Sequence, residues 1–236
     1  MISSIPKWIG NLFEATLSPN VKVVQTTYLS PQIKRIRFHG KVSNMNIQIG
    51  YANVIRVSET EFRNYTIAHH DIENDIFDII FHIHGNGVGS KYIDSLTTMD
   101  EVYISPPRGK KMYEAAVKKQ FIFGDETSLG FAISILPSLK KRDHQYQFCF
   151  ELDEENFNVP QLLGLEDFLL FPKTYSVSSE VWINELPIFE ADNWQEANFI
   201  LTGNVTSVQT FKKVLKAKKA GRILSQGYWL EGKKGL

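Results

Sequence analysis

Four consecutive residues, Arg-Asn-Tyr-Thr at positions 63–66, combine side chains that suit a phosphate and a flat ring. The guanidinium of Arg63 offers two parallel N–H donors, which match the oxygens of a phosphate. In an extended segment Tyr65 points the same way as Arg63, so its ring could stack on a planar ligand whose edge bonds to Thr66. An ordinary strand with an exposed arginine is the alternative that four residues leave open.

A glycine-rich segment follows at positions 84–90, with the sequence His-Gly-Asn-Gly-Val-Gly-Ser. Three glycines in five residues allow the backbone to approach a ligand closely, and Ser90 is placed to cap a following helix. The segment therefore indicates either a phosphate-binding turn or a simple hairpin loop.

Two later segments, residues 121–128 and 199–206, share one order of features: apolar strand, glycine, polar turn, helix. At the carboxyl edge of a parallel sheet, helix N-termini offer free N–H groups, so both turns are candidates for a nucleotide site. The first turn carries Asp125 and Glu126, which either repel a phosphate or simply cap the helix and complement its dipole. Neither segment has the spacing GxGxxG.

A group of histidines is a further candidate, for a metal site. His82 and His84 share one face of a predicted strand, and positions 69–71, His-His-Asp, lie across a predicted turn from them. Imidazole and carboxylate suit zinc or iron. Because the sequence shows no set of four ligands with a recognisable spacing, we predict no metal site.

The first half of the chain must position these groups on strands. Short β-branched or alternating segments, separated by glycine and proline, predict an antiparallel barrel or sandwich. The expected strands are 21–28, 33–39, 45–49, 53–57, 77–83 and 102–104, with one helix at 90–96. A further helix is expected at the start, where Ser4 and Pro6 precede an apolar stripe that reaches Leu17.

From position 120 onward strands and helices alternate, which is typical of a mostly parallel sheet flanked by helices. The expected strands are 121–123, 146–152, 181–183, 199–201 and 223–229, and the expected helices are 129–136, 162–169 and 203–221. We therefore predict two domains: an antiparallel β-barrel over residues 1–112 and an α/β domain over residues 113–236.

Composition excludes several classes of partner. The 236 residues carry 26 Lys+Arg and 26 Asp+Glu, and zero net charge argues against a nucleic acid or anionic membrane gathered by bulk electrostatics. No segment reaches the ~20 apolar residues of a membrane-spanning helix, and the start lacks the pattern of a secretory signal. The single cysteine, Cys149, rules out an internal disulfide. We expect a cytoplasmic protein.

Taken together, these segments resemble the siderophore-interacting protein family, which comprises FAD-dependent ferric-siderophore reductases of the ferredoxin-NADP reductase superfamily. Residues 63–67 are similar to its Arg-x-Tyr-Thr signature, and residues 81–90 to its glycine-rich turn near the FAD diphosphate. Residues 106–109, Pro-Pro-Arg-Gly, resemble a Gly-Pro-Arg-Gly segment. Residues 123–129 resemble a Gly-Asp-Glu-Thr-Ala-Leu turn, and residues 227–229 match a Gly-Tyr-Trp segment. The resemblance covers nearly the whole chain, in the same order.

The resemblance implies a ferredoxin-NADP reductase-like fold with an FAD site in the first domain and a nicotinamide site in the second. Arg63 would bind an FAD phosphate, Tyr65 would stack on the isoalloxazine ring, and Thr66 would lie near flavin N5. The implied FAD-binding residues are Arg63, Tyr65, Thr66, Ile67, His84, Gly85, Gly87, Val88, Gly89 and Ser90. Those implied on the nicotinamide and flavin side are Gly124, Asp125, Glu126, Thr127, Tyr228 and Trp229. Cations that could attract an anionic chelate are Lys34, Arg35, Arg108, Lys110 and Lys111.

The implied reaction passes electrons from NADH or NADPH through FAD to a ferric siderophore or another Fe(III) chelate, and the cofactor supplies the chemistry. Two alternatives stay open: a related flavin oxidoreductase that uses ferredoxin, free flavin or a quinone, and a non-enzymatic protein that binds a siderophore or nucleotide. Three departures from the family pattern bear on the choice. Ala68 and Leu230 stand where arginines are expected, and Asn204 stands where a glutamate is expected.

Overall fold

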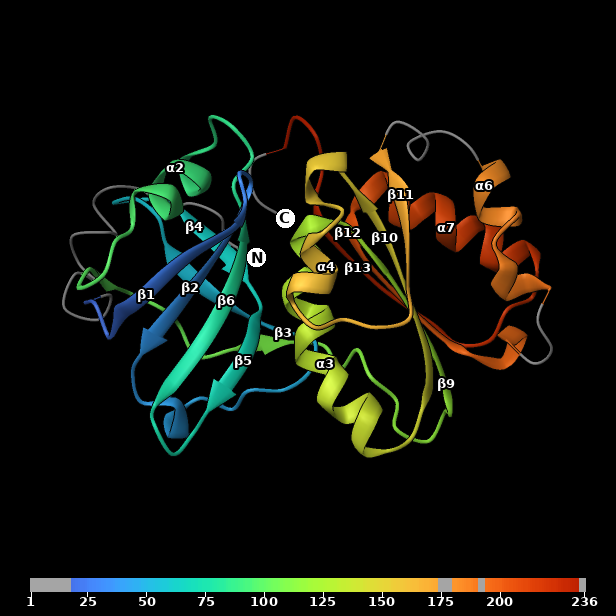
Figure 1. The fold of residues 1–236 in the computed structure, drawn as a ribbon, viewed down its shortest axis with the longest axis horizontal. Helices are drawn as coiled ribbons and strands as arrows, with labels where there is room; N and C mark the ends of the chain where they lie inside the picture. The colour runs from blue at the N-terminus through green and yellow to red at the C-terminus, as the bar shows by residue number, and fades with distance from the viewer. Residues whose placement is uncertain (1–17, 174–179, 191–193, 234–236) are drawn as a thin grey trace. The chain divides into compact units, whose positions relative to one another are not determined.

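The computed structural model describes residues 18–173, 180–190 and 194–233, and the chain divides between Lys111 and Met112 into two compact units (Figure 1). The helix expected up to Leu17 lies outside the described residues, as do the start of the first expected domain and the end of the second.

The first unit contains two antiparallel sheets, with strand orders β5-β6-β2-β1-β7 and β4-β3-β8. The first sheet consists of β1 (Val21–Ser30), β2 (Ile33–His39), β5 (Ile67–Asp71), β6 (Ile76–His82) and β7 (Glu101–Val102). The second consists of β3 (Tyr51–Arg56), β4 (Phe62–Tyr65) and β8 (Arg108–Gly109), and a 3-10 turn, η1, spans Val42–Asn44. The helix α2 (Val88–Ser95) follows the glycine-rich segment.

Alternating side chains from both sheets form one apolar core in this unit. Phe77, Ile79 and Phe81 of β6 are fully buried or nearly so, and Ile55 of β3 belongs to the same cluster. The helix α2 adds Ile93 to that cluster. Period-two alternation therefore predicted correctly which side chains of β6 enter this core, although Asp78 and Ile80 on the other face are buried as well.

The strand expected at 45–49 is wrong. The backbone there bonds locally, since the N–H of Met45 donates to the carbonyl of Val42 and that of Ile47 to the carbonyl of Met45. Met45 and Ile47 nevertheless pack against the core, so the alternation reflects burial without strand pairing. The strand expected at 102–104 is also shorter, because Ile104 forms only an isolated bridge with Ile55.

The second unit is a parallel sheet in the order β11-β10-β9-β12-β13. Its strands are β9 (Lys119–Gly124), β10 (Gln145–Leu152), β11 (Phe168–Pro172), β12 (Asn198–Asn204) and β13 (Ile223–Trp229). All four neighbouring pairs are parallel. The helices α3 (Leu129–Lys141) and α4 (Val159–Leu162) cover one face, and α6 (Glu180–Asn184) and α7 (Val205–Ala217) cover the other (Figure 1). The fold class is thus confirmed.

Short 3-10 turns complete this unit: η2 (Glu126–Ser128), η3 (Glu154–Asn156), η4 (Pro187–Phe189) and η5 (Trp194–Glu196). Three sequence-based boundaries need correction. The expected helix at 162–169 is instead the end of α4, a turn with Gly164 at φ 74°, and the start of β11. The expected strand at 181–183 is the helix α6, and α3 continues through Pro137 because Leu139 extends its buried face.

Cys149 provides a direct test of packing in the second unit. The residue is fully buried in β10, and burial raises the pKa of its thiol well above the usual value. Because the thiolate is the reactive form, native protein should not react with Ellman's reagent. Protein unfolded in guanidinium chloride should release one equivalent of chromophore per chain. Rapid reaction of the native protein would contradict this packing.

Candidate functional site

Three of the residues predicted to bind one ligand meet in the first unit. A Cβ atom added at Gly89 would lie 3.0 Å from Cγ of Arg63 and 3.1 Å from the hydroxyl oxygen of Tyr65. The arginine and the tyrosine come from β4, whereas Gly89 lies in the first turn of α2. The structure therefore brings together residues that are more than twenty positions apart in the chain, and glycine is the residue that permits their approach.

The side chains of Arg63 and Tyr65 make different kinds of contact. The guanidinium donates to the carbonyl of Phe62 at 2.8 Å and, over 3.3 Å, to a carboxylate oxygen of Glu61. The ring of Tyr65 meets that of Phe81 edge to face, with centroids 4.7 Å apart. Burial raises the pKa of the Tyr65 hydroxyl, so that the group stays protonated at neutral pH.

The glycine-rich segment leads into α2 as expected, but Ser90 does not cap the helix. Gly87 is the N-cap residue, and the Ser90 hydroxyl accepts the N–H of His84 at 3.0 Å. His84, Gly85, Gly87 and Val88 are exposed, whereas Gly89 and Ser90 are buried. The two residues expected to bind FAD directly after β4 differ from each other in exposure: Thr66 is half-buried, and Ile67 lies in the core.

The five cations expected to attract an anionic chelate do not form one group. Lys34 is only 2% exposed, and its ammonium donates to the carbonyls of Ile93, Asp94 and Leu96. A lysine ammonium has three N–H donors, so these three carbonyls use all of them. The prediction that Lys34 contacts the substrate is therefore wrong, because its ammonium binds the end of a helix. Arg35 is half-buried in β2, while the three remaining cations are exposed at and after β8: Arg108, Lys110 and Lys111.

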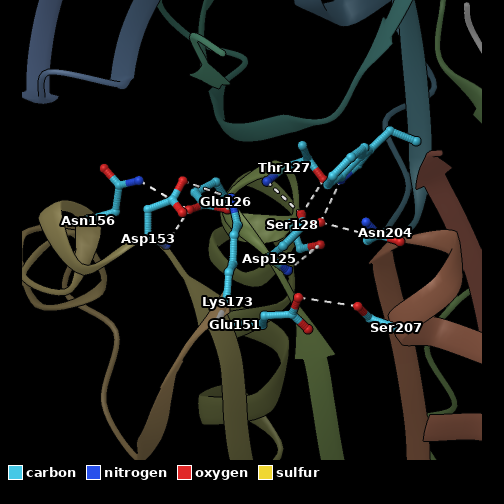
Figure 2. Close-up of polar contacts among 11 residues, drawn as sticks. Asp125, Glu126, Thr127, Ser128, Glu151, Asp153, Asn156, Lys173, Asn204 and Ser207 are labelled. Carbon is cyan, nitrogen blue, oxygen red and sulfur yellow. Dashed lines mark hydrogen bonds and ion pairs between the residues drawn. The ribbon is translucent and has the colours of Figure 1, made fainter. Parts of the chain in front are cut away.

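In the second unit, a side chain with a polar group stands at the carboxyl end of each of the five strands, and Figure 2 labels four of them, Asp125, Asp153, Lys173 and Asn204. In an open parallel sheet, ligands bind at this edge where the strand order reverses, and here the reversal lies between β9 and β12. These five side chains are Asp125, Asp153, Lys173, Asn204 and Trp229. The predicted site thus lies at the edge that the topology favours.

Asp125 joins three of those strand ends. One carboxylate oxygen accepts the backbone N–H of Asn204 at 2.8 Å and the indole N–H of Trp229 at 2.7 Å. The other accepts the N–H and the hydroxyl of Thr127. The carboxylate is 2% exposed, so a buried anion of the protein itself occupies the end of β9, next to the N-terminus of α7.

Close packing explains the glycines around Asp125. A Cβ at Gly124 would lie 2.2 Å from Cβ of Ser128, and one at Gly203 would lie 2.6 Å from the Asp125 carboxylate. Gly203 also has a positive φ of 97°. Asn204 caps α7, because its side chain accepts the N–H of Thr206 at 2.7 Å. These glycines allow close packing. In each of the two turns, a side chain of the turn already accepts one of its backbone N–H groups: Asp125 accepts that of Thr127, and Asn204 accepts that of Thr206.

Glu126 anchors a second polar cluster with residues that the sequence did not single out. Its carboxylate accepts the N–H of Asp153 at 2.8 Å and the side-chain amide of Asn156 at 3.1 Å, and it pairs with Lys173 at 2.8 Å (Figure 2). Lys173 also contacts the Asp153 carboxylate at 2.9 Å. The one signal for Lys173 is its place directly after the apolar run 168–172.

Burial governs the ionisation of this cluster. Burial of Glu126, which is 1% exposed, raises the pKa of its carboxyl, and the nearby charge of Asp125 adds to the increase. Burial alone would lower the pKa of Lys173, but the carboxylates of Glu126 and Asp153 outweigh it and raise that pKa. The ammonium of Lys173 therefore opposes the increase in the pKa of Glu126.

The basic run at positions 212–222 is partly neutralised within the second unit. Lys213 pairs with Glu180, Arg222 pairs with Glu114 at 3.1 Å, and Lys218 lies over the ring of Phe189. Within residues 18–173, 180–190 and 194–233, no helix has the length and apolar character needed to span a membrane.

Both units are similar to parts of known proteins. Residues 20–113 match the family described as the oxidoreductase FAD-binding domain. The chain is similar to the siderophore-interacting protein from Acinetobacter baumannii, with TM-score 0.70 and 18% identity over 91% of both chains. It is also similar to a ferredoxin-NADP+ reductase from Plasmodium falciparum, with TM-score 0.66 and 13% identity over 88% of this chain and 95% of that one.

A larger protein contains a similar part. In full-length CYP116B46 from Tepidiphilus thermophilus the match has TM-score 0.71 and 10% identity, and it covers 89% of this chain but only 29% of that one. No curated protein matches the sequence significantly. Residues 20–113 therefore match an oxidoreductase FAD-binding domain, and the chain has the fold seen in a siderophore-interacting protein and in a ferredoxin-NADP+ reductase.

Proposed function

We propose that the protein is an FAD-dependent reductase of ferric chelates, ferric siderophores among them, with NADH or NADPH as electron donor. The observation that carries this proposal is the meeting of Arg63, Tyr65 and Gly89 inside the part of the chain that matches the FAD-binding domain. The buried thiol of Cys149, with its raised pKa, agrees with a protein whose redox chemistry comes from a bound cofactor. We also propose a cytoplasmic location.

The residues present fit the diphosphate end of a flavin nucleotide. The space beside Gly89 would be filled by any Cβ atom, and it lies against the arginine. We assign Arg63 and the N-terminal N–H groups of α2 to the diphosphate, because a guanidinium and a helix N-terminus both favour an anion. Tyr65 and Thr66 are assigned to the ring end of the same ligand.

When bound, FAD would accept a hydride from the nicotinamide and pass two electrons singly to two Fe(III) ions, with release of one proton. The chain's own residues orient the ligands. In the second unit we assign the edge at Gly124, Asp125 and Thr127 to the nicotinamide side, with Tyr228 and Trp229 adjacent. Asp125 fixes the orientation of the Trp229 indole through its N–H. Glu126 stays within its own polar cluster.

The visible spectrum of purified protein, before and after addition of FAD, tests the proposal first. Anaerobic titration with NADH and NADPH should then bleach the flavin band, and a panel of ferric chelates should restore it in stopped-flow measurements. Protein that binds no FAD would overturn the proposal, and a flavin that neither nucleotide bleaches would exclude both as donors.

Replacement of Arg63 tests the phosphate contact. We expect Arg63→Ala to weaken FAD binding by about 10–100-fold, the loss of one charge-assisted contact to a phosphate. Arg56→Ala is the matched control, because Arg56 lies in the paired strand β3 and its guanidinium donates to the carbonyls of two exposed residues, Ser58 and Glu59. FAD titration of the apoprotein measures both. Equal losses in the two variants would indicate a general effect of charge.

One observation favours a different electron acceptor. The burial of Lys34 and the presence of Ala68 in the core leave fewer cations for an anionic chelate than the sequence led us to expect. A related flavin oxidoreductase that reduces ferredoxin, free flavin or a quinone is therefore the second candidate. Reoxidation rates of the reduced flavin by these acceptors and by ferric chelates separate the two.

A further inference from the structure

The helix α2 contacts the rest of the first unit at both of its ends. It has only eight residues, of which Gly89, Ser90 and Ile93 are buried. A helix of this length is marginal without tertiary contacts. At its end, the buried ammonium of Lys34 donates to the carbonyls of Ile93, Asp94 and Leu96 over 2.8–3.1 Å.

Lys34 is itself fixed by its neighbour across the β1–β2 pair. Tyr28 lies opposite Lys34 in the register, and the ammonium lies 5.2 Å from the centre of the tyrosine ring. The Tyr28 hydroxyl donates to the Asp94 carboxylate, and burial together with Asp94 raises the pKa of that hydroxyl to about 12. Strands β1 and β2 therefore bind α2 through one carboxylate and three carbonyls.

The other end of α2 lies against Arg63 at Gly89. Eight helical residues span about 12 Å, so a displacement at the C-terminal carbonyls is transmitted along a short rigid element to the N-terminal N–H groups. A cation at a helix C-terminus also stabilises the helix through its dipole.

From these contacts we infer that Lys34 is a positioning residue for the FAD diphosphate: it binds the C-terminal carbonyls of α2 and thereby fixes the N-terminal N–H groups beside Arg63. This inference rests on the proposed function, because it concerns the same ligand. It assigns a role to a buried cation that does not contact the ligand.

The experiment compares FAD binding by the wild-type apoprotein and by Lys34→Met, which keeps the length of the side chain but removes its charge and donors. We expect FAD binding to weaken about 10-fold, from the loss of a buried cation at a helix terminus. At saturating FAD the visible absorption and circular dichroism spectra of the bound flavin should match those of the wild type, because the ring end of the site is unchanged.

Lys91→Met is the control for charge. Lys91 is exposed on the same helix and nearer its N-terminus, so a long-range effect of charge on an anionic ligand would be larger there. We expect Lys91→Met to change the affinity by less than about twofold, as for most surface substitutions. An equal or greater loss in Lys91→Met, an unchanged affinity in Lys34→Met, or an altered flavin spectrum in Lys34→Met would each overturn the inference.

Two further outcomes are distinguishable. If Lys34→Met does not fold, Tyr28→Phe removes only the hydroxyl that binds Asp94, and it should weaken FAD binding about 2–5-fold, the loss of one hydrogen bond. No change in Tyr28→Phe would then count against the inference. If the wild-type protein itself binds no FAD, the proposed function fails, and the inference fails with it.

Discussion

Asp125→Ala should lower the free energy of unfolding of the α/β unit by about 3–5 kcal/mol, because it leaves several part-buried donors without an acceptor. The orphaned groups are the N–H of Thr127, the N–H of Asn204 and the indole N–H of Trp229. Urea unfolding followed by tryptophan fluorescence measures the loss, since Trp182, Trp194 and Trp229 all belong to this unit.

Two further variants sharpen this test. Asp125→Asn preserves the shape, but each carboxylate oxygen accepts two donors, so the amide NH2 must face a pair of donors in either orientation. We expect it to lose more than half as much stability as Asp125→Ala. Glu154→Ala removes an exposed carboxylate and should change stability by no more than about 0.5 kcal/mol. A loss below about 1 kcal/mol in Asp125→Ala would contradict the assigned network.

Lys173→Met should produce a loss of stability that depends on pH. Removal of the lysine leaves the buried Glu126 carboxylate without its counter-ion, which costs about 3–5 kcal/mol when the carboxylate is charged. The folded-state pKa of Glu126 is already raised by burial, and the substitution raises it further. The loss of stability should therefore be small below the unfolded pKa of about 4.3. It should grow as the pH rises toward the folded pKa of Glu126 in the variant, and be complete above that pKa.

Unfolding at pH 5 and pH 8 checks this prediction. Lys140→Met is the matched control: Lys140 pairs with Glu166 at 2.9 Å, but both side chains are largely exposed, so the variant should show little change at either pH. The double variant Lys173→Met with Glu126→Gln should recover stability at pH 8 and lose the pH dependence. An equal loss at both pH values in Lys173→Met would show that the pair acts through packing alone.

The strands that sequence predicted well are those whose side chains alternate or are uniformly apolar. Phe77, Ile79 and Phe81 alternate along β6, and the short apolar run of β9 meets Gly124. The wrong predictions arose where the spacing of apolar residues did not reveal the conformation of the backbone. The spacing of Leu162, Leu165 and Leu169 fits a helix, but positive φ angles at Gly164 and Asp167 turn the chain between α4 and β11.

The candidate site was predictable only in part, and the reason is again physical. Arg63, Tyr65 and Gly89 belong to local patterns with a direct chemical meaning, and the structure brings them together. Lys34 carries no such pattern, because its partners are carbonyls about sixty residues away. Sequence shows a lysine on a strand, but only the tertiary structure shows whether its ammonium contacts solvent or a helix end.

The dependence of Asp125 on Trp229 has a consequence for synthesis of the protein on the ribosome. Among the five strands of the sheet, β13 comes last in the chain and pairs only with β12. Until residue 229 has left the ribosome, β12 presents an open edge and the Asp125 carboxylate lacks its indole donor. An unpaired strand edge invites association with other chains. Nascent chains that stall before β13 should therefore depend most on chaperones.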